Sequence, residues 1–207
     1  MLVGRLEDWF QYDHRVKDVL FFMTYMLVQR ASGIIDRIPL IVREDMIENL
    51  DKSILNHKVH VYGHIVTNMI YNELLIKVRV NAITPVDDSV EDKNEVVIAG
   101  CFNEKYPYLR TTFTGKEICD FLVISRRKYQ KSAIIPVIAW NRVARYIIEN
   151  FYRGNVYLKA RFQSREIRDI SNGIIKSKTV YELSAYYATC YFKKEKLEEH
   201  DNDSAEM

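Results

Sequence analysis

Basic and aromatic side chains alternate along the second half of this 207-residue chain. The candidate binding residues are Tyr108, Arg110, Phe113, Lys116, Arg126, Arg127, Lys128, Tyr129, Lys131, Trp140, Arg142, Arg145, Arg161 and Arg165. Cations of this kind neutralise phosphate groups, and exposed rings stack on nucleic-acid bases at about 1–3 kcal/mol each without reading their sequence. Trp140 and Tyr129 have polar and basic neighbours, which favours contact with a ligand, whereas Phe121, Phe151 and Tyr157 fit core packing better. The mixture therefore points to a single-stranded polyanion as the ligand.

Two of these arginines belong to the last predicted hairpin. Arg161 and Arg165 fall on the same face because alternate residues of a strand share a side. Together with Arg168, Lys176 and Lys178, they could close over a strand of nucleic acid. A solvated hairpin without a ligand is the alternative for this segment.

Sequence signatures of an enzyme are absent. The chain holds no GxxxxGK or GxGxxG phosphate loop, no HExxH pair and no serine within GxSxG. His60 and His64 are four residues apart but fall on a predicted strand, so they do not converge on a metal as they would on a helix. The basic half contains carboxylates without the spacing of a metal-dependent nuclease, namely Glu117, Asp120, Glu166 and Asp169. We expect a non-catalytic protein without a cofactor, and a nuclease is only the third hypothesis.

Charge is distributed unevenly along the chain. The first 93 residues carry a net charge of −3, residues 94–187 carry +8, and residues 188–207 carry −3, which together give the overall +2. The near-neutral total therefore conceals a basic unit between two acidic ones, as expected when one domain meets a polyanion.

The apolar runs, the first residues and the cysteines indicate in which compartment the protein resides. No run approaches the roughly 20 apolar residues of a membrane span, and the first residues lack the basic and apolar regions of a signal peptide. The three cysteines, Cys101, Cys119 and Cys190, show neither a CxxC pair nor metal-ligand spacing, which indicates free thiols. We expect a cytoplasmic, nucleoid-associated protein with no membrane partner.

The elements that must position the candidate residues follow the order β-β-β-α-β-β. In the second half, strands are predicted over 94–102, 118–125, 133–140, 155–165 and 179–187, with a turn at 169–173. An apolar stripe at 143, 144, 147 and 148 predicts a helix capped by Asn141 and stopped by Gly154. The first half gives the same order less regularly, with strands over 19–30, 35–42, 58–67 and 73–84 and a helix over 45–55. The stretch 6–12 fits either an added strand or a helical turn.

A fixed offset relates the two halves. The segment IPLIV at 38–42 recurs as IPVIA at 135–139, which is 97 positions later, and VHVYGHI at 59–65 matches VYLKARF at 156–162 in pattern at the same offset. Two matches at the same offset indicate a duplicated domain. Five strands with a helix between the third and fourth is the order of the OB-fold, a small Greek-key barrel. We predict a mainly β chain with two tandem OB-fold barrels, at 1–86 and 94–190. An acidic linker at 87–93 joins them, and a flexible acidic tail follows at 191–207.

Residues 94–187 resemble the bacterial single-stranded DNA-binding protein family. The resemblance rests on NEVVIAG at 94–100, PYLR at 107–110, VIAWNR at 137–142, YRGNVYL at 152–158 and RFQSR at 161–165. By this resemblance Trp140 falls at a base-stacking position, Tyr129 lies near another, and Arg110 and Arg165 match recurrent basic positions. The whole chain resembles the longer members of the family, in which a divergent OB domain precedes a recognisable one.

Several positions depart from the family pattern. The family places a tryptophan before its third strand where this chain has IIP at 134–136, and a further stacking ring where it has Ile167. Some stacking energy is therefore expected to be missing. The tail also lacks the aromatic tip that recruits replication partners in the family. In the first half Arg43 takes the place of Trp140, and an arginine plane can still stack on a base. The negative charge of that domain argues against DNA binding, so we expect dimerisation or partner contact for it.

The resemblance implies a protein that coats single-stranded DNA through its second barrel, with little sequence preference, in replication, recombination or repair. By analogy with four-barrel assemblies in the family, we expect a homodimer. The alternative is an adaptor of a primosome or recombination complex that uses the same barrels mainly to hold other proteins.

Overall fold

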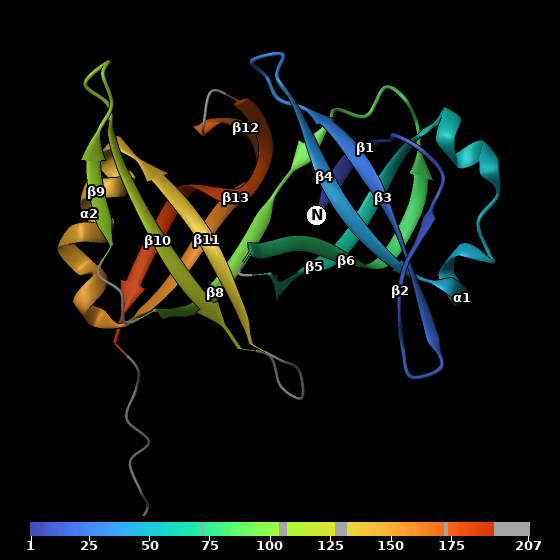
Figure 1. The fold of residues 1–207 in the computed structure, drawn as a ribbon, viewed down its shortest axis with the longest axis horizontal. Coiled ribbons are helices and arrows are strands. Elements are labelled where there is room, and N and C mark those ends of the chain that lie inside the picture. The colour runs from blue at the N-terminus through green and yellow to red at the C-terminus, as the bar shows by residue number, and fades with distance from the viewer. Residues whose placement is uncertain (72, 104–106, 127–131, 172–173, 193–207) are drawn as a thin grey trace, which may run out of the picture.

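The computed structural model describes residues 1–71, 73–103, 107–126, 132–171 and 174–192. Two β-barrels lie side by side (Figure 1). The strands of the first sheet are β1 (Leu2–Leu6), β2 (Gln11–Val16), β3 (Val19–Gln29), β4 (Ile35–Arg43), β5 (Lys58–Ile70), β6 (Glu73–Val86) and β7 (Lys93–Asn94). Those of the second are β8 (Val96–Phe102), β9 (Tyr108–Thr111), β10 (Glu117–Ser125), β11 (Ala133–Trp140), β12 (Asn155–Ser171) and β13 (Ile174–Tyr191). The helical segments are α1 (Glu44–Ile47), η1 (Lys52–Asn56), α2 (Asn141–Asn150) and η2 (Phe151–Arg153).

Each sheet closes on itself. The first has the strand order β2-β3-β4-β6-β5-β1-β7, and an additional pairing of β1 with β3 closes the barrel. The second has the order β11-β13-β12-β8-β10-β9 and is closed by β10 and β11. In both barrels the strand before the helix pairs in parallel with the second strand of the hairpin that follows the helix, Leu40 of β4 with Val78 of β6 and Val137 of β11 with Leu183 of β13. The prediction of two tandem OB-fold barrels in a mainly β chain is confirmed.

The internal repeat reappears as matching structure. The register of β5 shifts between Tyr62 and Gly63, and that of β12 shifts between Lys159 and Ala160. These two irregularities are separated by the same 97 positions as the sequence repeat. A bulge increases the local twist of a strand, so both barrels bend at the same place.

Glycine is required where the first strand of each barrel changes partner. In the second barrel β8 pairs with β12 along most of its length and with β10 at its end. A Cβ atom on Gly100 would lie 2.5 Å from the carbonyl oxygen of Ile124 in β10. Gly4 of β1 approaches the carbonyl oxygen of Leu27 in the same way. The backbones can come this close only without a side chain between them.

The helix expected over 45–55 is wrong in extent. The chain forms the four residues of α1, leaves the helix, and returns as the 3-10 segment η1. The N–H of Leu50 donates to the carbonyl of Ile47 at 2.9 Å, in a tight turn after α1. The side chain of Asp51 then caps η1 by accepting a hydrogen bond from the N–H of Ser53 at 2.7 Å. Such a local bond favours the start of a new helical segment over continuation of the first.

Asn141 does not cap α2 as expected. Trp140 occupies the N-cap position, without a side-chain hydrogen bond to the helix. Asn141 has a φ of 46°, and its side-chain oxygen accepts a hydrogen bond from the N–H of Glu117 at 3.2 Å. The asparagine therefore ties the start of α2 to β10.

Strand limits also differ from the expectations. The last hairpin is longer than predicted, because β12 and β13 continue to pair as far as Ser171 and Ile174. The stretch 6–12 contains the end of β1 and the beginning of β2. Most of the expected acidic tail, residues 193–207, lies outside the described residues.

The acidic segment 87–93 is held against the first barrel by ion pairs. Asp88 pairs with Arg5 at 3.0 Å, and Asp92 pairs with Lys58 at 2.8 Å. The N–H of Gln29 also donates to Asp92 at 2.7 Å. The connection between the barrels is therefore fixed along the edge of the first sheet.

A buried carboxylate joins the two barrels. Asp36 of β4 is 0% exposed, pairs with both edges of the Arg30 guanidinium, and accepts a hydrogen bond from the N–H of Ser164 in β12 at 3.1 Å. Beside it, the amide of Asn94 donates to the carbonyl of Phe162 at 2.6 Å and accepts from its N–H at 2.8 Å. These side chains satisfy the edge of β12 where its pairing with β8 has ended.

Candidate nucleic-acid interface

The outer surface of β9, β10 and β11, here called the platform, lies at the front of the second barrel (Figure 1). Phe121 and Val123 of β10 are buried inside the barrel, so Asp120 and Leu122, which alternate with them, face outward. The strand register sets Asp120 of β10 opposite Tyr108 of β9 and Ile138 of β11. Side chains from three strands therefore meet on one surface.

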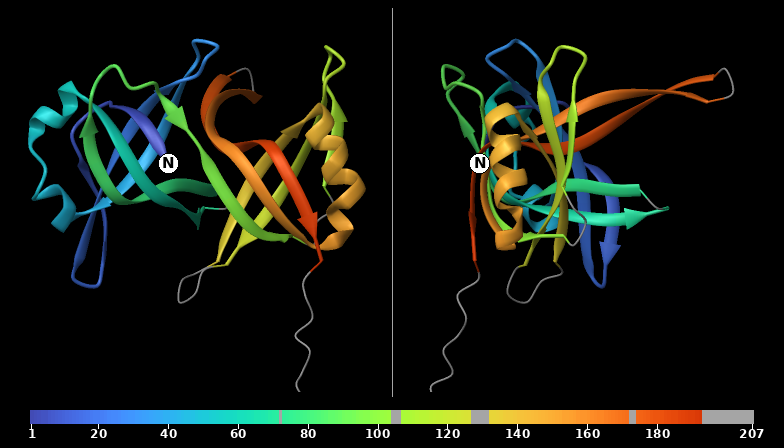
Figure 2. Two further views of the ribbon diagram at one scale, coloured as in Figure 1. Left: turned by 180° about the vertical axis from the view of Figure 1, so that it is seen from behind. Right: turned by 90° about the vertical axis from the view of Figure 1, so that its left-hand side faces the viewer.

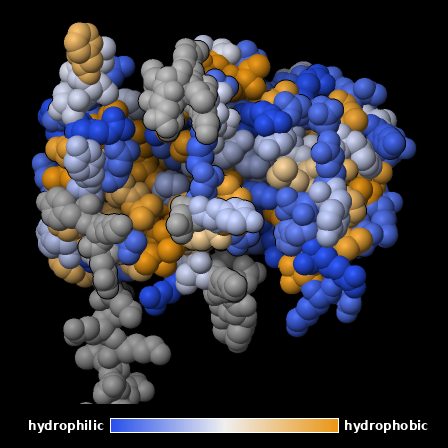
Figure 3. Space-filling model, in the orientation of Figure 1, coloured by the Kyte–Doolittle hydropathy of each residue, from blue (hydrophilic) through white to orange (hydrophobic). Residues whose placement is uncertain are grey.

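The platform combines rings with cations. Arg110 and Trp140 both pair in register with Ile118 of β10, one on either side of it. Trp140 is partly buried, and Tyr108 is 64% exposed. Figure 3 shows apolar surface over this part of the left-hand barrel, among more polar side chains. The platform thus offers flat apolar surface beside a guanidinium.

Arg110 is held in place by a carboxylate. Its Nε atom lies 2.7 Å from Oδ2 of Asp120. This hydrogen bond raises the pKa of Arg110 despite the opposing effect of burial, and the charges of Glu182 and Tyr108 act in the same direction. Glu182 belongs to β13, so the electrostatic surface around Arg110 extends beyond the three platform strands.

The hairpin of β12 and β13 borders the platform on the side of the first barrel. Glu182 is only 6% exposed and accepts hydrogen bonds from Gln163 at 2.7 Å and from Arg165 at 2.9 Å. Arg161 contacts Gln163 from the other side at 3.4 Å. Arg161 and Arg165 therefore lie on one face, as their spacing predicts. Glu182, which stands between them, was missed in the sequence because its pairing depends on strand register.

Arg161 and Arg165 differ in their access to a ligand. Burial lowers the pKa of Arg161, and the nearby positive charge of Arg30 lowers it further, against a smaller raising effect of Asp36. Arg161 therefore belongs to the junction between the barrels. Arg165 has a side chain that is 45% exposed and can reach a phosphate while it keeps its contact with Glu182.

Further candidates surround the platform at one end. Arg145 of α2 forms an ion pair with Glu117, which raises the pKa of Arg145. Arg142 is exposed in the first turn of α2. Phe113 is fully exposed, and Lys116 is exposed, in the tight turn between β9 and β10. These side chains extend the basic and aromatic surface past the end of the strands.

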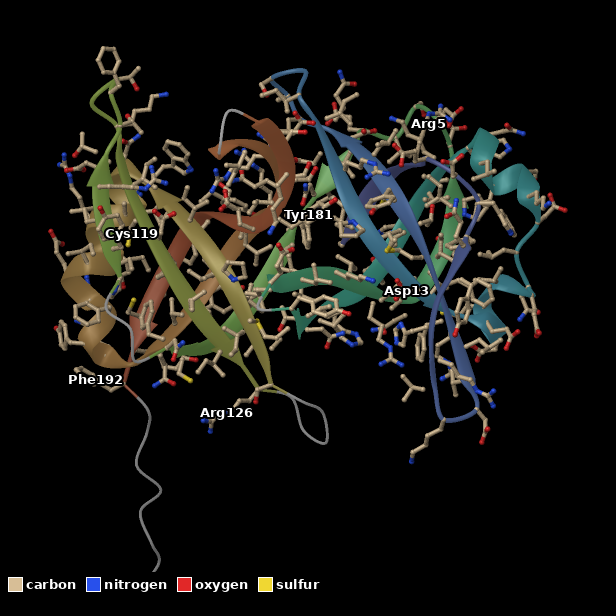
Figure 4. All side chains as sticks on the ribbon, viewed as in Figure 1. Arg5, Asp13, Cys119, Arg126, Tyr181 and Phe192 are labelled. Carbon is tan, nitrogen blue, oxygen red and sulfur yellow. The ribbon has the colours of Figure 1, made fainter. Side chains whose placement is uncertain are left out.

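One further candidate lies at the other end of β10. Arg126 is exposed there, below the barrel in Figure 4. Arg127, Lys128, Tyr129 and Lys131 lie outside the described residues.

Within the described ranges no three His, Cys, Asp or Glu side chains come together in a way that could hold a metal ion. Two of the carboxylates considered for a nuclease, Glu117 and Asp120, are instead paired with arginines. In the same part of the chain, no helix is long and apolar enough to cross a membrane.

The corresponding face of the first barrel is covered by its own side chains. Phe21 of β3 is 4% exposed, and the ring of His14 stacks on it with centroids 4.9 Å apart and planes within 15°. The guanidinium of Arg79 lies 4.6 Å from the centroid of the same ring. Phe21 therefore offers no free face to a base.

A second ring of the first barrel is covered in the same way. The guanidinium of Arg37 lies 3.3 Å from the ring centroid of Tyr25. Tyr181 of β13 stands between the two barrels near this pair (Figure 4). Burial raises the pKa of Tyr181, and the positive charge of Arg37 opposes that shift. These contacts fasten the second barrel to the face of the first.

No family model matches the chain, and no curated protein matches it in sequence. Its likeness to known proteins is instead found in three dimensions, where both barrels can be compared together.

Crystal structures of the single-stranded DNA-binding protein from Thermus aquaticus are similar to this chain. The wild-type protein superposes with a TM-score of 0.72 at 15% sequence identity, over 94% of this chain and 92% of that chain. A deletion mutant of that protein superposes with a TM-score of 0.69 at 15% identity, over 96% of each chain. The match covers both barrels and so includes their arrangement. The chain has the two-barrel fold of the Thermus aquaticus protein, as the resemblance of the whole chain to the longer members of that family predicts.

Proposed function

We propose that this protein binds and coats single-stranded DNA through the platform, with little sequence preference and without catalysis. The observation that supports the proposal most strongly is the composition of that surface. Trp140 and Tyr108 present rings beside Arg110, and Arg165 stands across the same face. Bases stack on rings of this kind, and arginines bind the phosphates between them.

The carboxylates paired with Arg110 and Arg165 affect how these arginines bind a phosphate. Asp120 and Glu182 hold two guanidiniums in fixed positions. The pair of Arg110 with Asp120 is partly exposed, and an exposed ion pair is worth about 0.2–1 kcal/mol, so a phosphate can replace this carboxylate at small cost. Glu182 is buried, so a phosphate at Arg165 would bind the remaining N–H groups while this ion pair stays in place. Because two positive charges are partly neutralised beforehand, we expect a shallower dependence on salt than the count of arginines suggests.

Sequence tolerance follows from the same surface. The described platform residues are mostly apolar or ion-paired, and a ring stacks on any base because every base has a flat face. A protein of this kind covers a strand rather than selecting a site. We place it in DNA replication, recombination or repair, where single strands are exposed, and hence with the DNA of the cell.

A homodimer completes the proposal. The back of the second barrel, seen from behind in Figure 2, is formed by β8, β12 and β13. Val97, Lys159 and Tyr187 lie in register across it, and Tyr186, which precedes Tyr187, falls at the register shift without a partner in β12. The side chains of Val97, Tyr186 and Tyr187 are 51%, 55% and 47% exposed. A second copy would cover this apolar surface, and light scattering of a Tyr187→Glu variant tests it by a change from dimer to monomer.

The central experiment uses Trp140 as both contact and reporter. The chain has two tryptophans, so Trp9→Phe leaves Trp140 as the single fluorophore. We expect labelled single strands to quench it and to bind more tightly than duplexes, with affinity falling as salt rises. On this background Trp140→Ala should weaken binding by about 1–3 kcal/mol, whereas Trp140→Phe should keep most of it.

Other outcomes would favour the adaptor. Equal, weak binding of single and double strands, or an alanine variant that binds like its parent, contradicts a stacking platform. The barrels would then serve mainly to hold proteins of a replication or recombination complex.

A further inference from the structure

A cavity of about 770 Å³ is lined by residues of both barrels. The hairpin of β5 and β6 leaves the first barrel and reaches the second (Figure 1). There the N–H of Ile134 in β11 donates a hydrogen bond to the hydroxyl oxygen of Thr67 in β5 at 3.1 Å. Thr67 lines the cavity, so this contact forms part of its wall. The volume lies within the range of about 300–1,000 Å³ that is typical of sites for small molecules.

The walls of this cavity are mainly aliphatic. Strand β5 contributes Ile65 and Val66, β8 contributes Val96 and Ile98, and β4 contributes Ile41. Apolar walls favour an apolar ligand, because the ligand and the walls are both removed from water when it binds. The cavity is therefore suited to a hydrocarbon.

A nucleic-acid base fits these walls less well than an aliphatic chain does. Bases bind to proteins of this kind by stacking on accessible rings. Phe21 lines the cavity, but the ring of His14 stacks on it and the guanidinium of Arg79 lies 4.6 Å from its centroid. The hydroxyl of Thr67 already accepts a hydrogen bond, and that of Ser125 donates one to a backbone carbonyl at 3.2 Å. These groups are engaged with the protein itself.

One side of the cavity is cationic. His64 and Arg79 line the cavity and also a second hollow of about 410 Å³, to which Arg43 and Asp45 contribute. The guanidinium of Arg79 places its flat face on Phe21, which leaves the N–H groups in its plane to donate to an anion. Arg43 pairs with Asp45 at 2.8 Å. Since one carboxylate faces two guanidiniums, the second hollow keeps a net positive charge.

The other charged groups of the cavity are compensated nearby. Glu95 forms an ion pair with Lys93 at 3.1 Å, and the ammonium group of Met1 donates to the backbone carbonyl of Glu95 at 2.8 Å. His14 contacts the carboxylate of Asp13 at 2.7 Å. The excess positive charge therefore lies on the side of Arg79.

We propose that this cavity binds an amphipathic anion with one aliphatic chain, of the fatty-acid class. The chain lies between β5 and β8, and the carboxylate binds the N–H groups of Arg79. Tyr108, Arg110 and Trp140 of the platform lie outside the lining, so the inference does not depend on the proposed function. Because both barrels line the cavity, a bound ligand stabilises their docked arrangement.

Calorimetric titration of the full chain with octanoate, decanoate and dodecanoate tests the cavity, each ligand being kept below its micellar concentration. We expect one saturable site whose affinity rises by up to about fourfold for each added methylene group. The melting temperature should rise with the concentration of dodecanoate. Dodecylammonium has the same chain and the opposite charge, so it should bind on the order of tenfold more weakly than dodecanoate.

Arg79→Gln tests the binding of the carboxylate. The variant should bind dodecanoate on the order of tenfold more weakly, whereas Arg79→Lys should keep most of the affinity. Arg15→Gln is the matched control, because Arg15 pairs with Asp18 on the surface of the same barrel and should leave the affinity unchanged. The comparison of dodecanoate with dodecylammonium needs no variant, so it decides the question even if Arg79→Gln fails to fold.

Three results would overturn the proposal. They are binding without saturation, equal affinity for dodecanoate and dodecylammonium, and an Arg79→Gln variant that binds dodecanoate as tightly as Arg15→Gln does. A fourth result would reassign the cavity. If a single-stranded oligonucleotide displaces dodecanoate and Arg79→Gln weakens both ligands alike, the cavity belongs to the nucleic-acid site, and the fatty-acid site is wrong while the proposed function stands.

Discussion

Removing the charge of Asp36 is the most demanding test of how the two barrels are joined. Its carboxylate is fully buried, meets both edges of the Arg30 guanidinium, and accepts a hydrogen bond from Ser164 of the other barrel. Asp36→Asn keeps the shape of the side chain. It removes the negative charge and turns an amide N–H₂ group toward groups that can only donate.

The expected cost follows from burial. Breaking a buried ion pair by changing one partner typically costs about 3–5 kcal/mol, because the other charge is left without compensation. The side chain of Arg30 is 18% exposed and keeps some access to water, so we expect the lower end, about 3 kcal/mol. Arg161 lies close enough to Arg30 for the two charges to interact, so the loss of Asp36 also leaves two guanidiniums facing each other.

Equilibrium unfolding in urea measures this loss. Asp18→Asn is the control, because Asp18 pairs with Arg15 on the surface of the same barrel, where the two side chains are 97% and 59% exposed. The control should cost less than about 1 kcal/mol. If Asp36→Asn costs no more than Asp18→Asn, the carboxylate is not buried between the barrels and the reasoning is refuted.

Two further predictions concern the second barrel. Gly100→Ala would place a Cβ atom 2.5 Å from a carbonyl oxygen of β10. It should destabilise the protein by about 1–3 kcal/mol, and an unchanged melting temperature would contradict the close approach. Burial raises the pKa of Cys119 from 9.0 to about 12. The folded state therefore holds this proton more tightly, so the stabilisation is complete below pH 9 and is lost as the pH rises toward 12. Iodoacetamide labelling with mass spectrometry at pH 8 should modify the partly exposed Cys101 first and Cys119 only after unfolding, and early labelling of Cys119 would contradict its burial.

The fold could be predicted because the apolar patterns that mark its strands are local and occur in both halves of the chain. Alternating apolar residues mark the strands, and the 97-position offset assigns both halves to the same strand order. The helix over 45–55 could not be predicted correctly, since an apolar stripe does not reveal that Asp51 bonds to the backbone of Ser53. Local pattern also stops short of the true ends of β12 and β13, which depend on pairing between the strands.

The residue types of the candidate site could be predicted from the sequence, but the contacts between those residues could not. The mixture of rings and cations is visible in the sequence. The pairing of Arg165 with Glu182, which are 17 positions apart, appears only once β12 and β13 are in register. The approach of β5 to β11 depends on the docking of two barrels, since Thr67 and Ile134 are 67 positions apart. No property of either segment alone could show that the two segments would meet.

The unequal faces of the two barrels give the molecule a direction. Phe21 and Tyr25 of the first barrel are covered, whereas the platform of the second is open, so a bound strand meets two different ends of the protein. In the proposed homodimer a twofold axis would relate the two copies, so their platforms would point in opposite directions. Each copy would still carry an acidic end, from the unit of net charge −3, and a basic end, from the unit of net charge +8. A single strand that crossed both platforms with the same polarity on each would therefore have to turn between them and curve around the dimer.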